Sequence, residues 1–524
     1  MPTLDWIGKA AVVNHHRKVP YHLLRCDREL SAGDADAGNL LVQGDNLLAL
    51  KALLPYYAGK VKCIYIDPPY NTGNENWVYN DNVNSPEIRR WLSQTVGKEG
   101  EDLSRHDKWL CMMYPRLALL RDFLTEDGAI LVSIDDTEYQ HLVMMMAELF
   151  GPQNHSFTVI WQHSVQPKGY SGKLSVHHNY LACFRKSTSF TLHDIARRDE
   201  HNVNYGNPDN DPNGPWRSGD VRNALYRPNL IYDLQTPSGK TIRPPAKGWR
   251  WSKETMQAKI ESGEIVFRDD ETKILRKIYL KEQHGRAPES IWFGEDVGTT
   301  RQANQELKEI FDGSPPFDTP KPVGLIRRIL EVISDKDSLI LDSFAGSGTT
   351  AHAVLAQNKA DGGSRRFITV EMNETICRDV TAQRIQKAIN GYGDTPGLGG
   401  GFRFCKLGAA LFDDSGNIAD DVKFSDLAAH VFFTETGSPI PKRVDGRTPL
   451  LGVHQGQAIY LLFNGVLGDK RAAGGNVLSG PLLQSLPKHS GPRIIYGERC
   501  LLSPQRMKRE RIVFKQVPYG IKVT

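Results

Sequence analysis

Between Asn39 and Trp161, short apolar runs typical of β-strands alternate with longer segments of helical periodicity. This alternation predicts parallel strands joined by crossover helices, because a parallel pair of strands needs a long connection. We expect strands at 40–42, 61–66 and 129–134, and helices at 46–57 and 109–124. Each expected strand ends in a polar or acidic loop. Because open α/β sheets bind their ligands beyond the carboxyl ends of the strands, we expect the chemistry of this chain in those loops.

The alternating pattern is interrupted by a loop-rich stretch and then resumes. Residues 162–316 contain many Pro, Gly, Asn and Asp residues, which predicts an inserted domain. Beyond it we expect helices at 323–334 and 349–357 and strands at 338–341 and 367–370. The fold class is therefore α/β, with one sheet assembled from two sequence segments. The expected divisions are an N-terminal arm (1–38), a first core segment (39–161), the insert (162–316), a second core segment (317–403) and a small C-terminal α/β domain (404–524).

Bulk properties exclude several protein classes. The chain has 524 residues and no apolar run near the roughly 18 residues that span a bilayer. Its first 18 residues lack the order of a signal peptide, so we expect a cytoplasmic protein without a membrane partner. The seven cysteines are scattered without a CxxC pair, which predicts reduced thiols and no metal site. A net charge of +4 permits nucleic acid as a partner but does not require it.

The strand expected at 61–66 runs directly into Asp67, Pro68, Pro69 and Tyr70. The lone pair of adenine's amino nitrogen is delocalised into the ring, and acceptors on its two N–H groups would free that lone pair. The Asp67 carboxylate and the Pro68 carbonyl can be those acceptors, since proline fixes φ and removes a competing donor. Tyr70 can stack on a base that has left the duplex. The alternative interpretation is a proline-rich turn with a surface tyrosine.

A glycine-rich loop follows the strand expected at 338–341 and leads into a helix. Two glycines permit close approach of a ligand to the backbone, and a helix N-terminus offers N–H groups to a carboxylate such as that of S-adenosylmethionine. A lone GxG could equally serve a nucleotide or helix packing, but the chain has no GxGxxG and no GxxxxGK[ST]. The candidate cofactor residues here are Asp342, Phe344, Ala345, Gly346, Gly348 and Thr349.

Two further strand ends carry candidate cofactor ligands. Glu371 ends the strand expected at 367–370, where an acid can reach ribose hydroxyls. Asp45 and Asn46 follow the strand expected at 40–42, and Asp45 could hydrogen-bond the cofactor's adenine or simply cap the next helix.

The stretch from Arg243 to Arg301 mixes Lys and Arg with tryptophan, tyrosine and phenylalanine, a combination suited to nucleic acid. The alternative is a solvated face over ordinary core aromatics. The candidate DNA contacts are Asn71, Lys247, Trp249, Arg250, Trp251 and Lys253.

Together these motifs resemble the β-group amino-methyltransferases, in which a DPPY loop precedes an FxGxG loop. They are more similar still to the modification subunits of Type III restriction-modification systems. That likeness covers about residues 1–405, is weaker beyond them, and includes Gly44 to Leu47, Tyr65 to Gly73, Tyr79 to Asp81, Trp109, Met113 to Leu117, Ser133 to Asp136, Gly248 to Ser252 and Thr319 to Pro322.

The resemblance implies a Rossmann-like methyltransferase sheet with an inserted target-recognition domain. It also implies transfer of a methyl group from S-adenosylmethionine to adenine N6 in double-stranded DNA, with S-adenosylhomocysteine as the product and no metal. By motif position, Asp67, Pro68, Pro69 and Tyr70 become catalytic, and Lys321 lies in the segment that covers the methionine end. The resemblance further implies a nucleoid-associated prokaryotic protein of restriction-modification or phage defence. It allows a homodimer and a helicase-nuclease partner, although family members are usually longer.

Other reactions fit the sequence less well. Methylation of cytosine at ring carbon five needs a cysteine that usually follows proline, and the chain contains no Pro-Cys pair. Methylation of cytosine N4 uses a similar loop, commonly with serine in place of the acid, so Asp67 favours adenine. RNA is less favoured as the substrate, because the inserted region shows none of the common single-strand modules. A small-molecule methyltransferase would not need the long insert. A DNA-recognition subunit of a nuclease complex, with methylation secondary or lost, remains the alternative of a different class.

Overall fold

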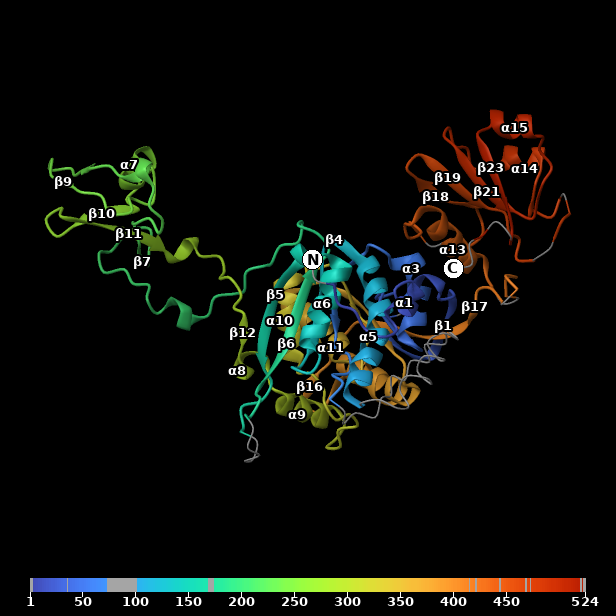
Figure 1. The fold of residues 1–524 in the computed structure, drawn as a ribbon, viewed down its shortest axis with the longest axis horizontal. Helices are drawn as coiled ribbons and strands as arrows, with labels where there is room; N and C mark the ends of the chain where they lie inside the picture. Colours follow the sequence, from blue (N-terminus) through green and yellow to red (C-terminus); the bar gives the residue numbers. More distant parts are fainter. Residues whose placement is uncertain are drawn as a thin grey trace. The chain divides into compact units, whose positions relative to one another are not determined.

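The computed structural model describes residues 3–34, 36–72, 101–167, 174–413, 415–419, 422–442, 444–466, 469–471, 473–518 and 521, with only the backbone of 101–105. These residues form two compact units. Unit 1 comprises Met1–Leu192 with Glu289–Thr524, and unit 2 comprises His193–Pro288. Many elements of both are labelled in Figure 1. None of the helices in the described ranges is long and apolar enough to span a membrane.

Unit 1 is built on a ten-stranded sheet in the order β1-β17-β2-β14-β13-β3-β4-β6-β5-β12. The strands from β17 to β4 are parallel neighbours, whereas β1 and β6 pair antiparallel with the strands beside them. The strands are β1 (His22–Gly33), β2 (Leu40–Gln43), β3 (Val61–Ile66), β4 (Leu124–Ile134), β5 (His155–Gln162), β6 (His178–Arg185), β12 (Ile291–Trp292), β13 (Leu339–Asp342), β14 (Arg366–Glu371) and β17 (Gly401–Ala410). The predicted α/β sheet and its core strands are confirmed.

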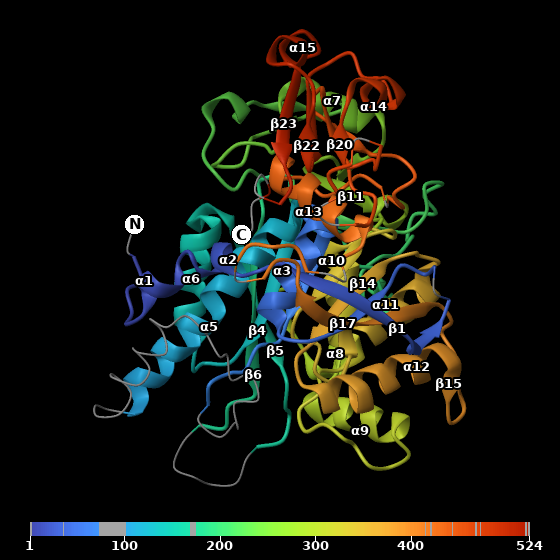
Figure 2. The same ribbon diagram turned by 90° about the vertical axis from the view of Figure 1, so that its right-hand side faces the viewer.

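Helices cover both faces of this sheet. Helices α5 and α6 lie on one side, and α11 and α12 lie on the other (Figure 2). Buried apolar side chains of α3, α5 and α6 pack in one core with those of the central strands. The helices are α1 (Lys9–Val12), α2 (His15–Lys18), α3 (Asn46–Tyr57), α5 (Glu101–Phe123), α6 (Tyr139–Phe150), α8 (Gly294–Val297), α9 (Thr300–Ile310), α10 (Val323–Ile333), α11 (Thr349–Asp361) and α12 (Gln383–Asn390).

The order of the strands brings together the two loops that the sequence singled out. Strand β3 pairs in parallel with β13, with Cys63 opposite Ile340 and Ile64 opposite Leu341. The carboxyl ends of both strands therefore lie side by side, although more than 270 residues separate them in the chain. Strand β4 flanks β3 on the other side. The loops after β3, β4 and β13 thus meet at one edge of the sheet.

The structural divisions differ from the expected ones. Strand β1, inside the predicted N-terminal arm, is an edge strand of the main sheet. Strands β6 and β12 and helices α8 and α9 fall within the predicted insert but belong to unit 1, so the separate unit spans only 193–288. Strand β17 crosses the predicted boundary at 404 and pairs with β1 and β2. The predicted insert therefore included segments of the main unit on both sides of residues 193–288, because their short strands and helices lie among loop-rich sequence.

The prediction that all cysteines are reduced is wrong for one pair. Cys26 of β1 and Cys405 of β17 face each other in the antiparallel register and form a disulfide. These residues are 379 positions apart, so only the pairing of two edge strands brings them together. The other five cysteines are free thiols, and four of them are buried.

Unit 2 is a small antiparallel sheet with one helix of regular length. Its three-stranded sheet has the order β10 (Ile265–Arg268), β11 (Lys273–Tyr279) and β7 (Trp216–Gly219). A two-stranded ribbon joins β8 (Leu234–Gln235) to β9 (Thr241–Ile242), and helix α7 spans Lys253–Glu261. Trp249 and Met256 lie in its core.

Residues 404–524 contain a small α/β sheet, as predicted. Its strands run in the order β18 (Leu450–His454), β19 (Gln457–Leu461), β21 (Arg493–Gly497) and β23 (Ile512–Gln516), and the last three are mutually parallel. Helices α13 (Phe424–Thr436), α14 (Gly480–Ser485) and α15 (Pro504–Arg509) accompany them, with a short β20–β22 pair at Val477–Leu478 and Arg499–Cys500.

Candidate functional site

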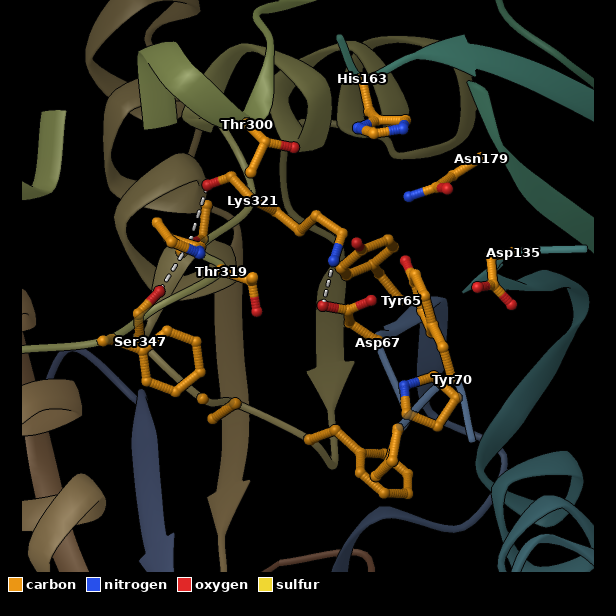
Figure 3. Close-up of a pocket in the computed structure, with 18 of the residues that line it drawn as sticks. Tyr65, Asp67, Tyr70, Asp135, His163, Asn179, Thr300, Thr319, Lys321 and Ser347 are labelled. Carbon is orange, nitrogen blue, oxygen red and sulfur yellow. Dashed lines mark hydrogen bonds and ion pairs between the residues drawn. The ribbon is translucent and has the colours of Figure 1, made fainter. Parts of the chain in front are cut away.

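A pocket of about 670 Å³ lies in unit 1 at the carboxyl ends of β3, β4 and β13 (Figure 3). The loop after β3 and the glycine-rich loop after β13 both line it. Each loop follows a fully buried strand, so the sheet core fixes where its first residue lies. The lining includes Asp67, Pro68, Pro69, Tyr70, Lys321, Asp342, Phe344, Ala345, Gly346 and Thr349, all of which the sequence singled out.

The Lys321 side chain reaches across the pocket to Asp67, as the dashed line in Figure 3 marks. Its ammonium forms an ion pair with Asp67 Oδ2 and lies 5.1 Å from the centre of the Tyr70 ring. The backbone of Lys321 is held in turn, because its carbonyl accepts a hydrogen bond of 3.1 Å from Thr349 Oγ1. A cation therefore sits beside the one acid of the Asp-Pro-Pro-Tyr loop, against the face of its aromatic ring.

The other carboxylate oxygen of Asp67 has no hydrogen-bond partner among the described residues, although it is buried. A buried acceptor without a donor is costly, so an atom of this kind in a binding pocket marks a place for a ligand donor. An N–H group of an aromatic amine is such a donor. The arrangement suits the role that the sequence predicts for Asp67.

Tyr70 is held by its hydroxyl, which makes a hydrogen bond of 2.7 Å with Ser133 Oγ at the end of β4. Burial, and then the negative charge of Asp67, raise the pKa of Tyr70 well above its usual value. The hydroxyl is therefore protonated throughout the neutral range, and the aromatic ring is the part of Tyr70 that can serve a ligand by stacking.

The glycine-rich loop is shaped by two left-handed residues. Gly346 has φ +49° and Gly348 has φ +80°, and a Cβ at Gly348 would lie 3.2 Å from both Thr381 Cγ2 and the Thr381 carbonyl oxygen. Gly348 caps α11 without a side chain, so the N–H groups of the first turn receive no side-chain acceptor from the cap. Such a helix start can take an anionic group.

Arg384 supports this loop from α12, and the sequence analysis did not identify it. Its side chain is fully buried, and Nη1 donates to Ser347 Oγ (3.0 Å) and to Thr349 Oγ1 (2.8 Å). Burial lowers the pKa of the guanidinium to about 10. No local pattern around Arg384 indicates this contact, because the partner loop lies 35 residues earlier.

Two buried acids lie beneath the same loop. Asp342 accepts hydrogen bonds from Phe344 N (2.9 Å) and from Thr350 Oγ1, and burial raises its pKa to about 7. Glu371 accepts from Gly346 N and Asn373 N, both at 2.9 Å, and does not line the pocket. In this structure Glu371 holds the backbone of the loop, and its predicted role as a ribose ligand stays a prediction.

Asp45 and Asn46 also lie outside the pocket lining. Asp45 caps α3, since its side chain accepts from Leu47 N (2.9 Å) and Leu48 N (3.0 Å). Asn46 is buried and donates to the Ser343 carbonyl at 3.1 Å, and it accepts a hydrogen bond from Arg116. Of the two interpretations of Asp45, the structure shows the helix cap, and Asn46 links α3 to the glycine-rich loop.

The predicted DNA contacts divide into buried and exposed residues. Asn71 is fully buried and donates to Glu138, so it is not a surface contact. Trp249 is a core residue of unit 2 whose Nε1 donates to the Tyr232 carbonyl at 2.8 Å. Both are corrections, because Asn71 is used for a buried hydrogen bond and Trp249 for packing in the core of unit 2. Lys247, Arg250 and Lys253 are exposed and Trp251 is half-buried.

The pocket lining includes polar residues that were not predicted as ligand contacts, among them Asp135, His163, Asn179 and Thr300. Asp135 follows β4 and lies within one of the resembling motifs, whereas the others come from the stretch assigned to the insert. The polar end of β4 was a usable signal, because acids that follow parallel strands are candidate ligands. The motif at Tyr79 to Asp81 lies outside the described residues.

Comparisons with known proteins identify the family of the chain. A family model described as DNA methylase matches residues 61–383, more than half of the chain and a span that includes both loops. The chain is 32% identical to the Type III restriction-modification enzyme StyLTI Mod subunit of Salmonella typhimurium, covering 73% of this chain and 60% of that protein. It is 30% identical to the EcoP15I Mod subunit of Escherichia coli, covering 71% and 64% respectively.

A shorter relative is covered more completely. The chain is 33% identical to the Type II methyltransferase M.KpnI of Klebsiella pneumoniae, covering 67% of this chain and 84% of that protein. The chain spans less than two thirds of the length of the two Mod subunits. On the family model and these relatives, the chain belongs to the DNA methylase family.

Proposed function

We propose that this chain transfers a methyl group from S-adenosylmethionine to the exocyclic N6 of an adenine that has rotated out of duplex DNA. The observation that carries the proposal is the buried Asp67 Oδ1, which lacks a hydrogen-bond donor among the described residues and lies in the same pocket as the glycine-rich loop. A reaction on a base needs the base outside the duplex stack, and Tyr70 supplies an aromatic surface for it.

The residues on the cofactor side fit S-adenosylmethionine. The left-handed Gly346 and Gly348 leave the backbone of the loop bare, and the start of α11 can take the carboxylate of the methionine part. Asp342, Phe344 and Ala345 also line the pocket. When bound, the sulfonium supplies an electrophilic methyl group. Glu371 and Arg384 hold the loop in shape from below.

On the acceptor side, Asp67 Oδ1 and the Pro68 carbonyl oxygen accept hydrogen bonds from the two N–H groups of the target amine. These hydrogen bonds localise the lone pair on nitrogen, and that lone pair forms the new N–C bond while the C–S bond breaks. The methylated amine carries a positive charge and loses a proton, for which a carboxylate or water suffices. Lys321 has to leave the face of Tyr70 before a base can stack there.

Duplex DNA is the proposed substrate because the chain belongs to the DNA methylase family. In unit 2, Trp251 is flanked by Arg250, Lys259 and Arg276, with the cations 5.7, 5.2 and 5.1 Å from the ring centre. Cations around a half-buried tryptophan suit a phosphate backbone, so unit 2 is proposed as the target-recognition region. A nuclease-bearing partner is proposed only because the relatives named above include Mod subunits.

The test is transfer of labelled methyl groups to unmethylated genomic DNA, with modified bases mapped by single-molecule sequencing. Wild type and Asp127→Ala, which removes an acid outside the pocket, should both place N6-methyladenine in one short motif, and Asp67→Ala should not. N4-methylcytosine as the product would replace adenine with cytosine as the acceptor. No transfer by a folded wild type that binds S-adenosylhomocysteine would refute the proposal in favour of a DNA-recognition subunit.

A further inference from the structure

The Asp-Pro-Pro-Tyr loop is held in place by side chains from outside it. Proline has no N–H group, so two consecutive prolines remove the backbone donors by which a loop can bond to itself. Trp109 Nε1 of α5 donates to the Pro69 carbonyl at 2.7 Å, and Ser133 at the end of β4 bonds to the Tyr70 hydroxyl. Asn71, the residue after the loop, donates to Glu138 Oε1 at the start of α6.

Glu138 is the most heavily bonded member of this set. Its side chain is fully buried, and it has no place in the lining of the pocket. His106 Nδ1 of α5 donates to Oε1 at 2.6 Å, and His141 Nδ1, one turn along α6, donates to Oε2 at 2.7 Å. Within the described ranges, these two histidines are its only ion-pair partners. A buried carboxylate with three donors is satisfied and is rigidly oriented.

This carboxylate acts on a residue whose backbone is unusual. Asn71 has φ +59°, a left-handed conformation that asparagine tolerates better than most residues but that still needs support. The hydrogen bond to Glu138 supplies that support immediately after Tyr70. A change at Glu138 therefore alters the direction of the chain one residue beyond the aromatic ring and four residues beyond Asp67.

We infer that Glu138 is a positioning residue for methyl transfer, which sets the geometry of the Asp67–Tyr70 loop through Asn71 and is itself oriented by His106 and His141. This inference rests on the proposed function. It extends that function to a residue that touches neither substrate nor cofactor. The glycine-rich loop is held by a different set of contacts, from Glu371 and Arg384, so cofactor binding should not depend on Glu138.

The same three side chains could also hold a metal ion, since their ligand atoms lie within 4.8 Å of one another. The distances argue for hydrogen bonds. Two ligands of one tetrahedral ion at metal–ligand distances near 2.05 Å lie about 3.3 Å apart. Both nitrogen–oxygen distances here are shorter, at 2.6 and 2.7 Å, which is the range of charge-assisted hydrogen bonds.

The experiment compares Glu138→Ala with Glu148→Gln, which removes a carboxylate near the other end of α6. Four quantities are measured on each protein: kcat, KM for DNA, Kd for S-adenosylhomocysteine, and Tm. For Glu138→Ala we expect kcat to fall by about 100-fold, the effect of a misplaced reacting group, with Kd for S-adenosylhomocysteine unchanged. Glu148→Gln should match the wild type in kcat and Kd. Wild-type kcat in a folded Glu138→Ala protein would overturn the inference.

A swap of the two polar groups tests the hydrogen bond itself and does not depend on how well Glu138→Ala folds. Asn71→Asp alone places two carboxylates against each other and should lower kcat at least as much as Glu138→Ala. Adding Glu138→Gln restores a donor and an acceptor in exchanged positions, and should recover kcat at least about tenfold over Asn71→Asp alone, the factor that one hydrogen bond to a charged group supplies. Failure of the double variant to recover would overturn the inference.

Two further outcomes are separable from these. An inactive wild type that binds S-adenosylhomocysteine would refute the proposed function and would overturn with it the inference that rests on it, whereas wild-type kcat in Glu138→Ala would overturn the inference alone. The hydrogen-bonded arrangement would be overturned in favour of a metal site by either of two results. One is binding of added zinc by the wild type but not by His141→Ala. The other is zinc in stoichiometric amount in the purified wild type that is lost in His141→Ala.

Discussion

Tyr70 combines a ring and a hydroxyl whose contributions can be separated. The ring lines the pocket and faces the Lys321 ammonium, whereas the hydroxyl bonds to Ser133 Oγ at 2.7 Å. Tyr70→Phe removes only the hydrogen bond, and a neutral hydrogen bond contributes about 0.5–1.5 kcal/mol. Tyr70→Ala also removes the stacking surface, which contributes about 1–3 kcal/mol per base.

These free energies translate into a clear order of rates. If the full effect appears in the rate of methyl transfer, Tyr70→Phe should slow it by no more than about tenfold, since about 1.4 kcal/mol corresponds to a factor of ten. Tyr70→Ala should slow transfer by about 5- to 150-fold from stacking alone, with the loss of the hydrogen bond in addition. Tyr70→Trp keeps a stacking surface and should lie between the two.

The assay is a single-turnover measurement with labelled S-adenosylmethionine and a DNA duplex that carries the mapped motif. Ser133→Ala removes the other partner of the same hydrogen bond and should reproduce Tyr70→Phe. The double variant should then be no slower than either single variant, because the two changes remove one interaction. These roles of the ring and the hydroxyl are contradicted if Tyr70→Phe is as slow as Tyr70→Ala, or if the effects of Tyr70→Phe and Ser133→Ala multiply.

The pH profile gives an independent check on the hydroxyl. Burial raises the pKa of Tyr70 well above its usual value, so the phenol is protonated at neutral pH and is not a general base. The profiles of wild type and Tyr70→Phe should therefore have the same shape between about pH 6 and 9, a range that lies below the usual pKa of tyrosine. A change of the methyl-transfer rate with pH that is present in the wild type and absent from Tyr70→Phe would contradict this assignment.

Three further predictions concern the glycine-rich loop and its supports. Gly348→Ala places a Cβ 3.2 Å from the Thr381 backbone in a left-handed conformation, and should destabilise the fold by about 1–3 kcal/mol in urea unfolding and weaken S-adenosylhomocysteine binding in calorimetry. Arg384→Met leaves Ser347 and Thr349 without a buried donor and should lower the free energy of unfolding by about 3 kcal/mol. The control Arg378→Met replaces an exposed arginine and should change the free energy of unfolding by less than about 0.5 kcal/mol. Burial raises the pKa of Asp342 to about 7, so the contribution of this carboxyl to folding stability is full below about pH 4 and is lost as the pH rises through 7. This decline in stability is about 4 kcal/mol at most. Asp342→Asn should remove it, as measured by urea unfolding between about pH 4 and 9.

Each of these predictions has an outcome that contradicts it. Wild-type stability in Gly348→Ala would show that the loop relaxes around a Cβ. Equal losses in Arg384→Met and Arg378→Met would show that burial of the guanidinium is not the cause. An unchanged pH dependence in Asp342→Asn would assign the decline to other groups.

Local patterns in the sequence determined the elements of the core and the residue types in the two loops. Periodicity identified the strands that became β2, β3, β13 and β14, because apolar runs of that length reflect burial on both faces of a parallel sheet. The acid, prolines and aromatic residue after β3 predicted the acceptor loop, because each residue type has its own bonding capacity. These inferences depend only on residues close together in the chain.

Tertiary structure alone decided which of these elements meet. The pairing of β3 with β13 brings the two loops into one pocket, and a packed connection places Lys321 against Asp67. The hydrogen bonds of Arg384 and Glu138 and the Cys26–Cys405 disulfide also join positions far apart in sequence. Trp249 and Asn71, which the sequence predicted as DNA contacts, are buried. Composition records which side chains are available, but sheet order and helix packing determine which of them face each other, and those depend on contacts throughout the chain.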